Sequence, residues 1–291
     1  MCTSTPSAPA PWARACAPAW LALMLLALPG CALQPPSTPA DSAWHAELER
    51  WPATDALLLG EQHDAPEHQR WEADSVRWLA ERGRLAALVI EMAEAGTGTD
   101  GLPPGANAAQ VYAALHWNEG AWPWQRYGPV IMAAVAAGVP VRGGNLPMAR
   151  MRAAMQDETL DKHLPPAALA LQRQAIADGH CGLLPADRVM PMVRIQLARD
   201  ASMAQAVLDA RQSGRTVLLV AGWGHVRRDL GVPTWLPPDL KTKAAIAQAG
   251  QALAATGSEA NYIHATPALA PRDHCAELRA HPPGSMAPVR R

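Results

Sequence analysis

Three short apolar runs, separated by stretches of helical pattern, constrain the fold of this chain more than any other feature. The runs are residues 55–61 (DALLLGE), 85–91 (LAALVIE) and 215–221 (RTVLLVA). Each has the length of a strand and is apolar at successive positions, as in strands that are buried on both faces. Strand–helix–strand units at this spacing predict a single α/β domain, with a mostly parallel sheet flanked by helices on both faces.

The segments around these runs extend the alternating pattern. The first predicted helix follows Asp64 and runs to about residue 82. Further helices are predicted at residues 107–116, 127–137, 147–155, 165–177 and 186–212. A third strand is predicted at 139–142, and residues 242–249 and 261–265 are interpreted as edge strands. Asp64 is expected to cap the first helix, because Pro66 and Glu67 follow it at the spacing of a capping box.

The start of the chain predicts export. Arg14 precedes an apolar stretch at 17–28, which is shorter than the roughly 20 residues that cross a bilayer. This stretch ends in Leu-Pro-Gly-Cys, which looks like a lipobox, so residues 1–30 are expected to be a signal peptide and Cys31 the lipidated residue. The alternative is a signal peptide that is cut elsewhere, with Cys31 incidental.

This organisation predicts a protein held at the cell envelope. Residues 31–40 are Pro- and Ser-rich and are interpreted as a tether, residues 41–280 as one α/β domain, and 281–291 as a disordered tail. The residue after Cys31 is Ala rather than Asp, which favours the outer membrane, facing the periplasm. The membrane is then contacted through the lipid alone. A formal net charge of -1 gives no indication of nucleic-acid binding.

The cysteine positions fit an oxidising compartment. Of the five cysteines, Cys2 and Cys16 belong to the signal and Cys31 takes the lipid, which leaves Cys181 and Cys275. A disulfide between these two is expected in an exported protein. Two free buried thiols are the alternative, whereas a metal site is disfavoured because no Cys-x-x-Cys spacing is present.

Polar side chains follow the ends of the predicted strands. Glu61 and His63 follow the first, Glu91 ends the second, Asn145 follows the third and His225 follows the last apolar run. The carboxyl ends of parallel strands share one edge of the sheet, where ligands of such folds bind. The two histidines stand in Gly-x-x-His frames, in which glycine allows a sharp turn.

Two interpretations of this cluster remain open. In the first interpretation, the cluster forms a site for a metal ion or haem iron, since histidine nitrogen and glutamate oxygen suit zinc-like metals and histidine binds haem iron. Alternatively, arginines neutralise Glu61 and Glu91 and the histidines cap loops. Arg194 and Asp200 are candidate partners of the carboxylates. Additional haem contacts could come from the Tyr127 phenolate and from three tryptophans that otherwise pack the core, namely Trp117, Trp122 and Trp124.

Several motifs occur in an order that resembles a known family. They are GEQHD (60–64), WQRYGP (124–129), NLP (145–147), CG (181–182), RDASMA (199–204), GHVR (224–227), GVP (231–233) and DHC (273–275). This set is similar to the ChaN family of haem-binding uptake lipoproteins, within the Tiki/TraB/erythromycin-esterase-like superfamily. The resemblance implies an α/β fold, an envelope lipoprotein, a role in haem or iron uptake, and pairing of Cys181 with Cys275.

Three functions follow as hypotheses. The favoured one is an envelope protein that binds haem through His63, His225, Tyr127 and Asn145, with a homodimer as one arrangement. The second is a metal-dependent hydrolase, because superfamily relatives use two Gly-x-x-His motifs in such chemistry; His63, His225 and Glu61 would hold the divalent ion, and Glu61 or Glu91 would act as general base. The third is a non-catalytic envelope partner protein.

Overall fold

The computed structural model describes residues 39–51, 54–103, 105–250 and 259–280. All of them belong to one compact unit bounded by Ser37 and Arg291. The predicted signal peptide, the predicted lipidation site Cys31, most of the predicted tether and the predicted C-terminal tail lie outside the described residues. Within the described part of the chain, no helix combines the length and the hydropathy needed to cross a membrane.

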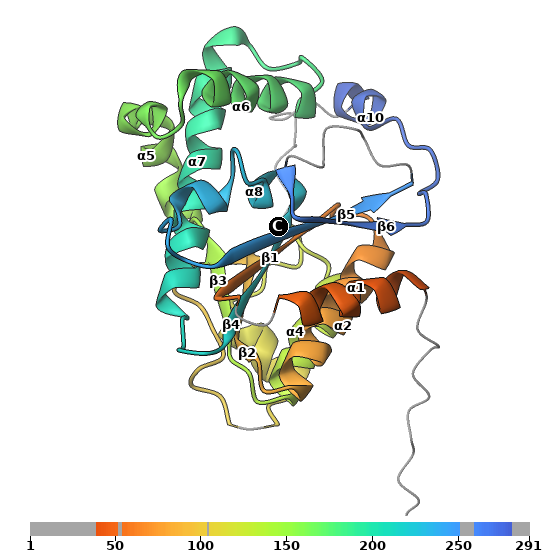
Figure 1. Cartoon of the computed structure of the whole chain (residues 1–291). Coiled ribbons are helices and arrows are strands. Elements are labelled where there is room, and N and C mark those ends of the chain that lie inside the picture. Colours follow the sequence, from red (N-terminus) through yellow and green to blue (C-terminus); the bar gives the residue numbers. More distant parts are fainter. Residues whose placement is uncertain (1–38, 52–53, 104, 251–258, 281–291) are drawn as a thin grey trace, which may run out of the picture. The chain divides into compact units, whose positions relative to one another are not determined.

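A six-stranded sheet forms the centre of this unit (Figure 1). Its order is β3-β2-β4-β1-β5-β6 and every neighbouring pair is parallel. The strands are β1 (Ala56–Glu61), β2 (Leu85–Glu94), β3 (Val141–Asn145), β4 (Thr216–Gly222), β5 (Thr242–Ala249) and β6 (Tyr262–Thr266). The predicted parallel α/β fold is therefore confirmed. The interpretation of 242–249 as an edge strand was wrong, because β5 pairs with both β1 and β6.

Helices cover both faces of the sheet, as predicted. They are α1 (Pro39–Arg50), α2 (Pro66–Glu81), α3 (Ala108–Ala114), α4 (Trp124–Ala136), α5 (Met148–Gln156), α6 (Pro166–Gly179), α7 (Ala186–Asp209), α8 (Trp223–Val226) and α10 (His274–Ala280), with 3-10 turns η1 (Glu158–Lys162) and η2 (Val232–Trp235). Leu57 and Leu59 pack in a core with α1, α2 and α4, whereas Leu58 points into the opposite core with α7 and α8. This alternation follows from the two-residue period of a strand.

Several local features of the helices differ from the sequence prediction. Asp64 does not cap α2, whose N-cap is Ala65 and has no side-chain cap; Asp64 accepts a hydrogen bond from the Gln62 amide instead. A capping box does form at α3, between Asn107 and Gln110. Helix α1 was not predicted, and its Trp44 is fully buried against the core.

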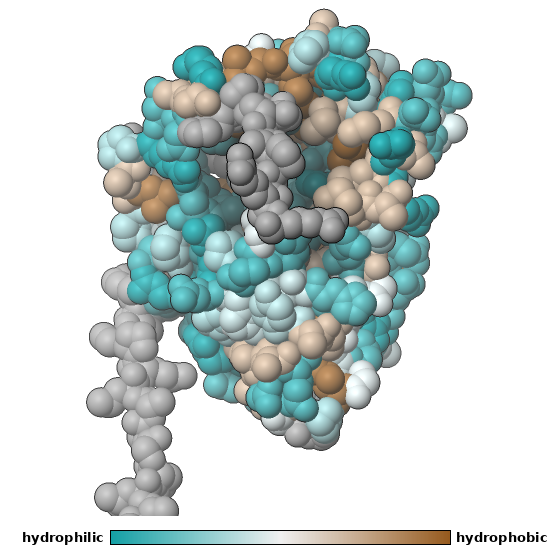
Figure 2. Space-filling model, turned by 180° about the vertical axis from the view of Figure 1, so that it is seen from behind, coloured by the Kyte–Doolittle hydropathy of each residue, from teal (hydrophilic) through white to brown (hydrophobic). Residues whose placement is uncertain are grey.

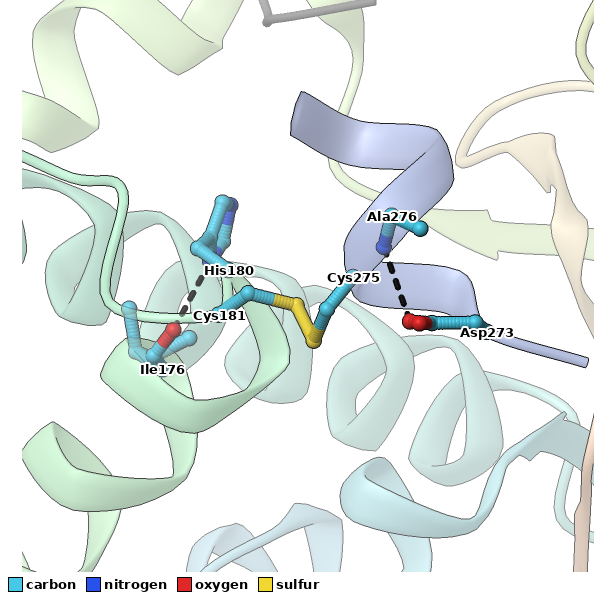
Figure 3. The surroundings of a disulfide bond; sticks show 6 residues. All are labelled: Ile176, His180, Cys181, Asp273, Cys275 and Ala276. Carbon is cyan, nitrogen blue, oxygen red and sulfur yellow. Dashed lines mark hydrogen bonds between the residues drawn. A yellow bond between two sulfur atoms is a disulfide. The ribbon is translucent and has the colours of Figure 1, made fainter. Parts of the chain in front are cut away.

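The predicted disulfide between Cys181 and Cys275 is present, with Cα atoms 5.6 Å apart (Figure 3). It joins the turn between α6 and α7 to α10, across 94 residues of sequence. Apolar side chains gather at the surface where α6 lies (Figure 2), and Leu171 and Leu183 are exposed there.

The connections around β1 and β4 determine where a crevice forms. These strands pair in register, with Glu61 opposite Gly222. From β1 the chain turns into α2 on one face, and from β4 it turns into α8 on the other. Adjacent strands whose connections leave to opposite faces form a topological switch point, where ligands of open α/β sheets bind.

Candidate functional site

The switch point brings together four of the residues predicted from the sequence. Glu61 and His63 come from the end of β1, Glu91 from β2 and His225 from α8. Glu91 lies between the two histidines, since its Oε1 is 3.4 Å from His225 Nε2 and its Oε2 is 3.9 Å from His63 Nε2. The predicted convergence at the carboxyl edge therefore exists, and Glu91 is the carboxylate that both histidines share.

Glu61 is fully buried and organises the β1 side of the site. Its Oε1 accepts a hydrogen bond from the Tyr127 hydroxyl at 2.8 Å and lies 2.7 Å from His63 Nδ1. Its Oε2 accepts from the Gln69 amide of α2. Among the described residues neither Glu61 nor Glu91 has an arginine partner, so the structural interpretation based on arginine pairs does not hold.

His225 is buried between two carboxylates. Its Nδ1 lies 2.6 Å from Asp200 Oδ1 on α7, and its Nε2 faces Glu91. Burial alone would lower the pKa of His225, but Glu91 and Asp200 raise it to about 10. At neutral pH the imidazole is therefore a cation whose two nitrogens are both engaged.

The two carboxylates beside His225 differ in their surroundings. Burial opposes ionisation of Glu91, but His225, His63 and the backbone N–H of Gly222 hold its pKa well below the usual range. The same burial raises the pKa of Asp200 to about 6 despite the neighbouring imidazolium. Site residues with such opposed shifts are typical of functional clusters, although structural ion pairs produce them too.

Tyr127 lies in the site, but not as a phenolate. Its side chain is buried and its hydroxyl donates to Glu61. Burial, with the negative charge of Glu61, raises the pKa of Tyr127 far above its ordinary range. The phenol therefore stays protonated and positions Glu61. Tyr127 was predicted to bind haem iron as a phenolate, and this role is different.

His63 is the accessible member of the cluster, with 38% of its side chain exposed. The hydrogen bond with Glu61 and the charge of Glu91 raise its pKa, although burial opposes the shift. The Trp122 ring meets the imidazole edge-on, with centroids 4.9 Å apart. Beside Nε2 lies Gly222, where a Cβ would come within 2.8 Å of that nitrogen, so glycine leaves the nitrogen room.

Other predicted residues lie outside this cluster. Asn145 ends β3, and no hydrogen bond or ion pair within the described chain joins its buried side chain to the histidines. Arg194 pairs with Asp161 at 2.7 Å rather than with a strand-end carboxylate. Asp200 does enter the site, but its partner is His225.

Sequence reasoning missed two residues of α2, Gln69 and Glu72. Gln69 binds Glu61, and Glu72 is fully buried with a pKa raised well above its usual range by burial and by Glu61. Their signal was present in the sequence, because the two stand three residues apart on a predicted helix, close to the apolar Trp71, and both are buried. Polar residues on a buried helix face indicate a buried polar network.

The predicted metal set of His63, His225 and Glu61 is not gathered around one point. No group of three or more His, Cys, Asp or Glu side chains in the described ranges has the geometry to hold a metal ion. The contacts explain this, since Glu61 faces Tyr127 and His63 Nδ1, whereas His225 is fixed between Asp200 and Glu91.

A separate cleft of about 800 Å³ lies between the loop after β2, β3, α5 and α7. Small side chains such as Ala154 and Ala201 line it, and Arg142 and Arg150 stand at its wall. Asp100 holds the Arg142 guanidinium through two hydrogen bonds. None of the site residues predicted from the sequence lines this cleft.

Comparison with known families decides the relationship. The family described as "Haem-binding uptake, Tiki superfamily, ChaN" matches residues 48–236, which contain the whole cluster. The chain belongs to this family. The resemblance to ChaN found in the sequence motifs is thus confirmed, and the histidine–carboxylate cluster is part of a ChaN-family domain.

One solved structure shares the fold of this chain, and a second gives only a weak match. The structure described as "Cofacial heme binding to ChaN of Campylobacter jejuni" superposes with a TM-score of 0.63 at 19% identity, covering 76% of this chain and 90% of that one. The type III effector HopBA1 gives a TM-score of 0.45 at 13% identity, over 83% and 99% of the two chains. Among curated proteins, none matches the sequence.

Proposed function

We propose that this ChaN-family protein binds haem at the carboxyl edge of its sheet, with His63 as the iron ligand. One observation carries the proposal: Glu61 holds His63 Nδ1 at 2.7 Å, which leaves Nε2 beside Gly222, with Glu91 Oε2 3.9 Å away. A carboxylate on one imidazole nitrogen fixes the tautomer and raises the basicity of the other, as in many metal-ligating histidines. The family relationship supports haem as the ligand.

The surroundings of His63 fit a flat, apolar group. Trp122 packs against the imidazole, and Trp223, which directly follows Gly222, is 45% exposed. Haem bound here would supply the iron, while this chain would orient the His63 ligand through Glu61 and Tyr127. His225 and Tyr127 do not fit as ligands, because the first is locked between two carboxylates and the second stays a phenol.

The cellular setting belongs to the same proposal. A lipid on Cys31 would tether the haem-binding domain to the envelope, with the outer membrane favoured. The disulfide between Cys181 and Cys275 supports an oxidising compartment, because such bonds persist in exported proteins. In that setting, the protein would receive or hold haem for uptake.

Haemin titration of residues 32–291, followed by the Soret band, tests the ligand assignment. We expect a saturable Soret shift that is lost in His63→Ala and retained in His225→Gln. His274→Ala is the matched control, because His274 is an exposed histidine on α10. A full Soret shift in His63→Ala would remove His63 as the ligand, and a flat titration of the unmodified protein would reject haem binding.

The metal-dependent hydrolase expected from the sequence is the second candidate, although its predicted ligands His63, His225 and Glu61 are not gathered around one point in the described chain. The observation that favours it is the opposed pKa shifts of the buried His225, Glu91 and Asp200, an arrangement seen at catalytic sites. An esterase and peptidase screen with added divalent metal tests it. Hydrolysis that stops on chelation and in Glu61→Gln would favour the enzyme, whereas a Soret shift without turnover would favour the haem binder.

A further inference from the structure

The segment of residues 267–280 runs from the end of β6 to the turn between α6 and α7. Figure 1 shows it leaving the sheet edge and ending in α10 beside α6. Cys275 bonds to Cys181 at that turn (Figure 3). We name residues 267–280 the strap, since they connect the sheet edge to the helices beyond the carboxyl ends of the strands.

The strap has little packing of its own. None of its residues is buried, and α10 contributes no side chain to a core. Its internal contacts, such as Arg272 with Glu277 and Asp273 with the Ala276 N–H, order the strap without attaching it. The strap is therefore attached to the rest of the domain by a few contacts. One of these contacts, the disulfide, is covalent.

A second contact joins the strap to the loop that carries His63. Arg272 Nη1 lies 3.4 Å from Asp64 Oδ2, and Asp64 directly follows His63. On the other side, Arg126 of α4 donates to the His63 carbonyl at 2.6 Å. The loop that carries His63 is thus bracketed by α4 and the strap.

The turn at the far end presents Cys181 in an unusual backbone conformation. Cys181 has φ 55° and Gly182 has φ 67°, and hydrogen bonds to Asp178 and Ala177 carbonyls hold both residues. A non-glycine residue in the left-handed region is uncommon and persists where the surroundings fix it. Here that conformation directs the sulfur toward α10.

We propose that the strap is a redox-controlled latch on the His63 loop. With the disulfide intact, Arg272 is held against Asp64 and restricts access to His63. A dithiol reductant would convert Cys181–Cys275 to two thiols while forming its own disulfide, and the strap, lacking buried side chains, would leave the loop. Haem exchange would then accelerate. This regulation rests on the proposed haem site at His63.

Chemical modification of His63 by diethyl pyrocarbonate, read by peptide mass spectrometry, tests the latch without haem. We expect the His63 modification rate to rise roughly five-fold on reduction with dithiothreitol or in Cys275→Ser, the size of effect expected from losing one weak surface tether. Arg272→Ala should raise the rate with the disulfide intact. Arg279→Ala, a change on the same helix α10, should leave it unchanged.

The rate of haemin release provides the second readout. We expect Cys275→Ser to release haemin faster than the unmodified protein, by a factor similar to that for His63 modification. Circular dichroism of the reduced unmodified protein controls for unfolding if Cys275→Ser folds poorly. An unchanged His63 rate with both thiols shown to be free would overturn the latch. A faster His63 rate without any haem binding would keep the latch and reject the haem proposal instead.

Discussion

The centre of the site is a buried cation held by two carboxylates. His225 takes Asp200 on Nδ1 and Glu91 on Nε2, and Glu91 also accepts the Gly222 N–H. Charges this deep in a protein are tolerated when they are paired and hydrogen-bonded. Each member of the cluster therefore stabilises the others, and the loss of one leaves an uncompensated charge.

Glu91→Gln tests this dependence. The substitution keeps the side-chain shape and an oxygen for Gly222, but removes the negative charge that faces both histidines. We expect a loss of about 3 kcal/mol in the free energy of unfolding, the usual effect of breaking a buried ion pair. Urea denaturation measures it, with Glu158→Gln as the exposed control. Equal midpoints for the two variants would contradict the charge assignment.

The pH dependence of stability follows from His225. Its pKa is about 10 in the folded protein, against an ordinary value of 6.5, so the folded state binds more protons between these values. Stability contributed by His225 is complete below pH 6.5 and is lost as the pH rises toward 10. We expect the unfolding free energy to fall across this range and the slope to be smaller in His225→Gln. Parallel curves for the two proteins would refute the prediction.

At the scale of elements, a close approach between β1 and α8 places His225 in the site. Gly60 lies under α8, and a Cβ there would come within 2.3 Å of the Val226 side chain and 3.0 Å of the Trp223 Cα. The missing side chain lets α8 rest directly on the strand. Gly60, the glycine of the Gly-x-x-His frame that carries His63, therefore also determines the position of His225.

Gly60→Ala should displace α8 and lower the free energy of unfolding by about 2 kcal/mol, as expected for an added methyl group in a packed core. Gly224→Ala is the matched control on α8 itself, since its Cβ would meet no atom within 4 Å and its φ is not positive. That control should change stability by less than about 1 kcal/mol. Thermal and urea unfolding compare the two, and a tolerated Gly60→Ala would show that α8 does not depend on this contact.

At the scale of the whole molecule, the site exists because β1 and β4 are neighbours. They are separated by more than 150 residues in sequence, and their connections leave on opposite faces of the sheet. The crevice between their ends collects side chains from β1, β2, α7 and α8. The same arrangement keeps the cluster apart from the 800 Å³ cleft beside β3 and α5.

Attachment of the molecule to a membrane is predicted to require Cys31. Cells expressing the full chain with labelled palmitate should show a labelled protein in the membrane fraction, because a lipidated cysteine anchors through its acyl chains. Cys31→Ser should abolish the label and release the protein, whereas Cys16→Ser, within the predicted signal peptide, should leave both unchanged. Label that persists in Cys31→Ser would exclude Cys31 as the anchor.

The sequence by itself determined the class of fold and much of the site's composition. Continuous apolar runs specify buried parallel strands, and their ends name Glu61, His63, Glu91 and His225, since period and burial are local properties of a chain. The pairing of Cys181 with Cys275 also followed from the cysteine positions. An ordered set of motifs indicated the ChaN family.

Only the tertiary structure decided how these residues act on one another. Strand order placed Glu91, rather than Glu61, between the histidines, and it made β5 an interior strand. Helix packing brought Asp200 to His225 and Gln69 to Glu61, and it buried the Tyr127 hydroxyl. Most of these contacts join residues far apart in sequence, and no local pattern encodes the distance between them. The charge and accessibility of each side chain depend on those contacts, so both properties could be determined only from the folded structure.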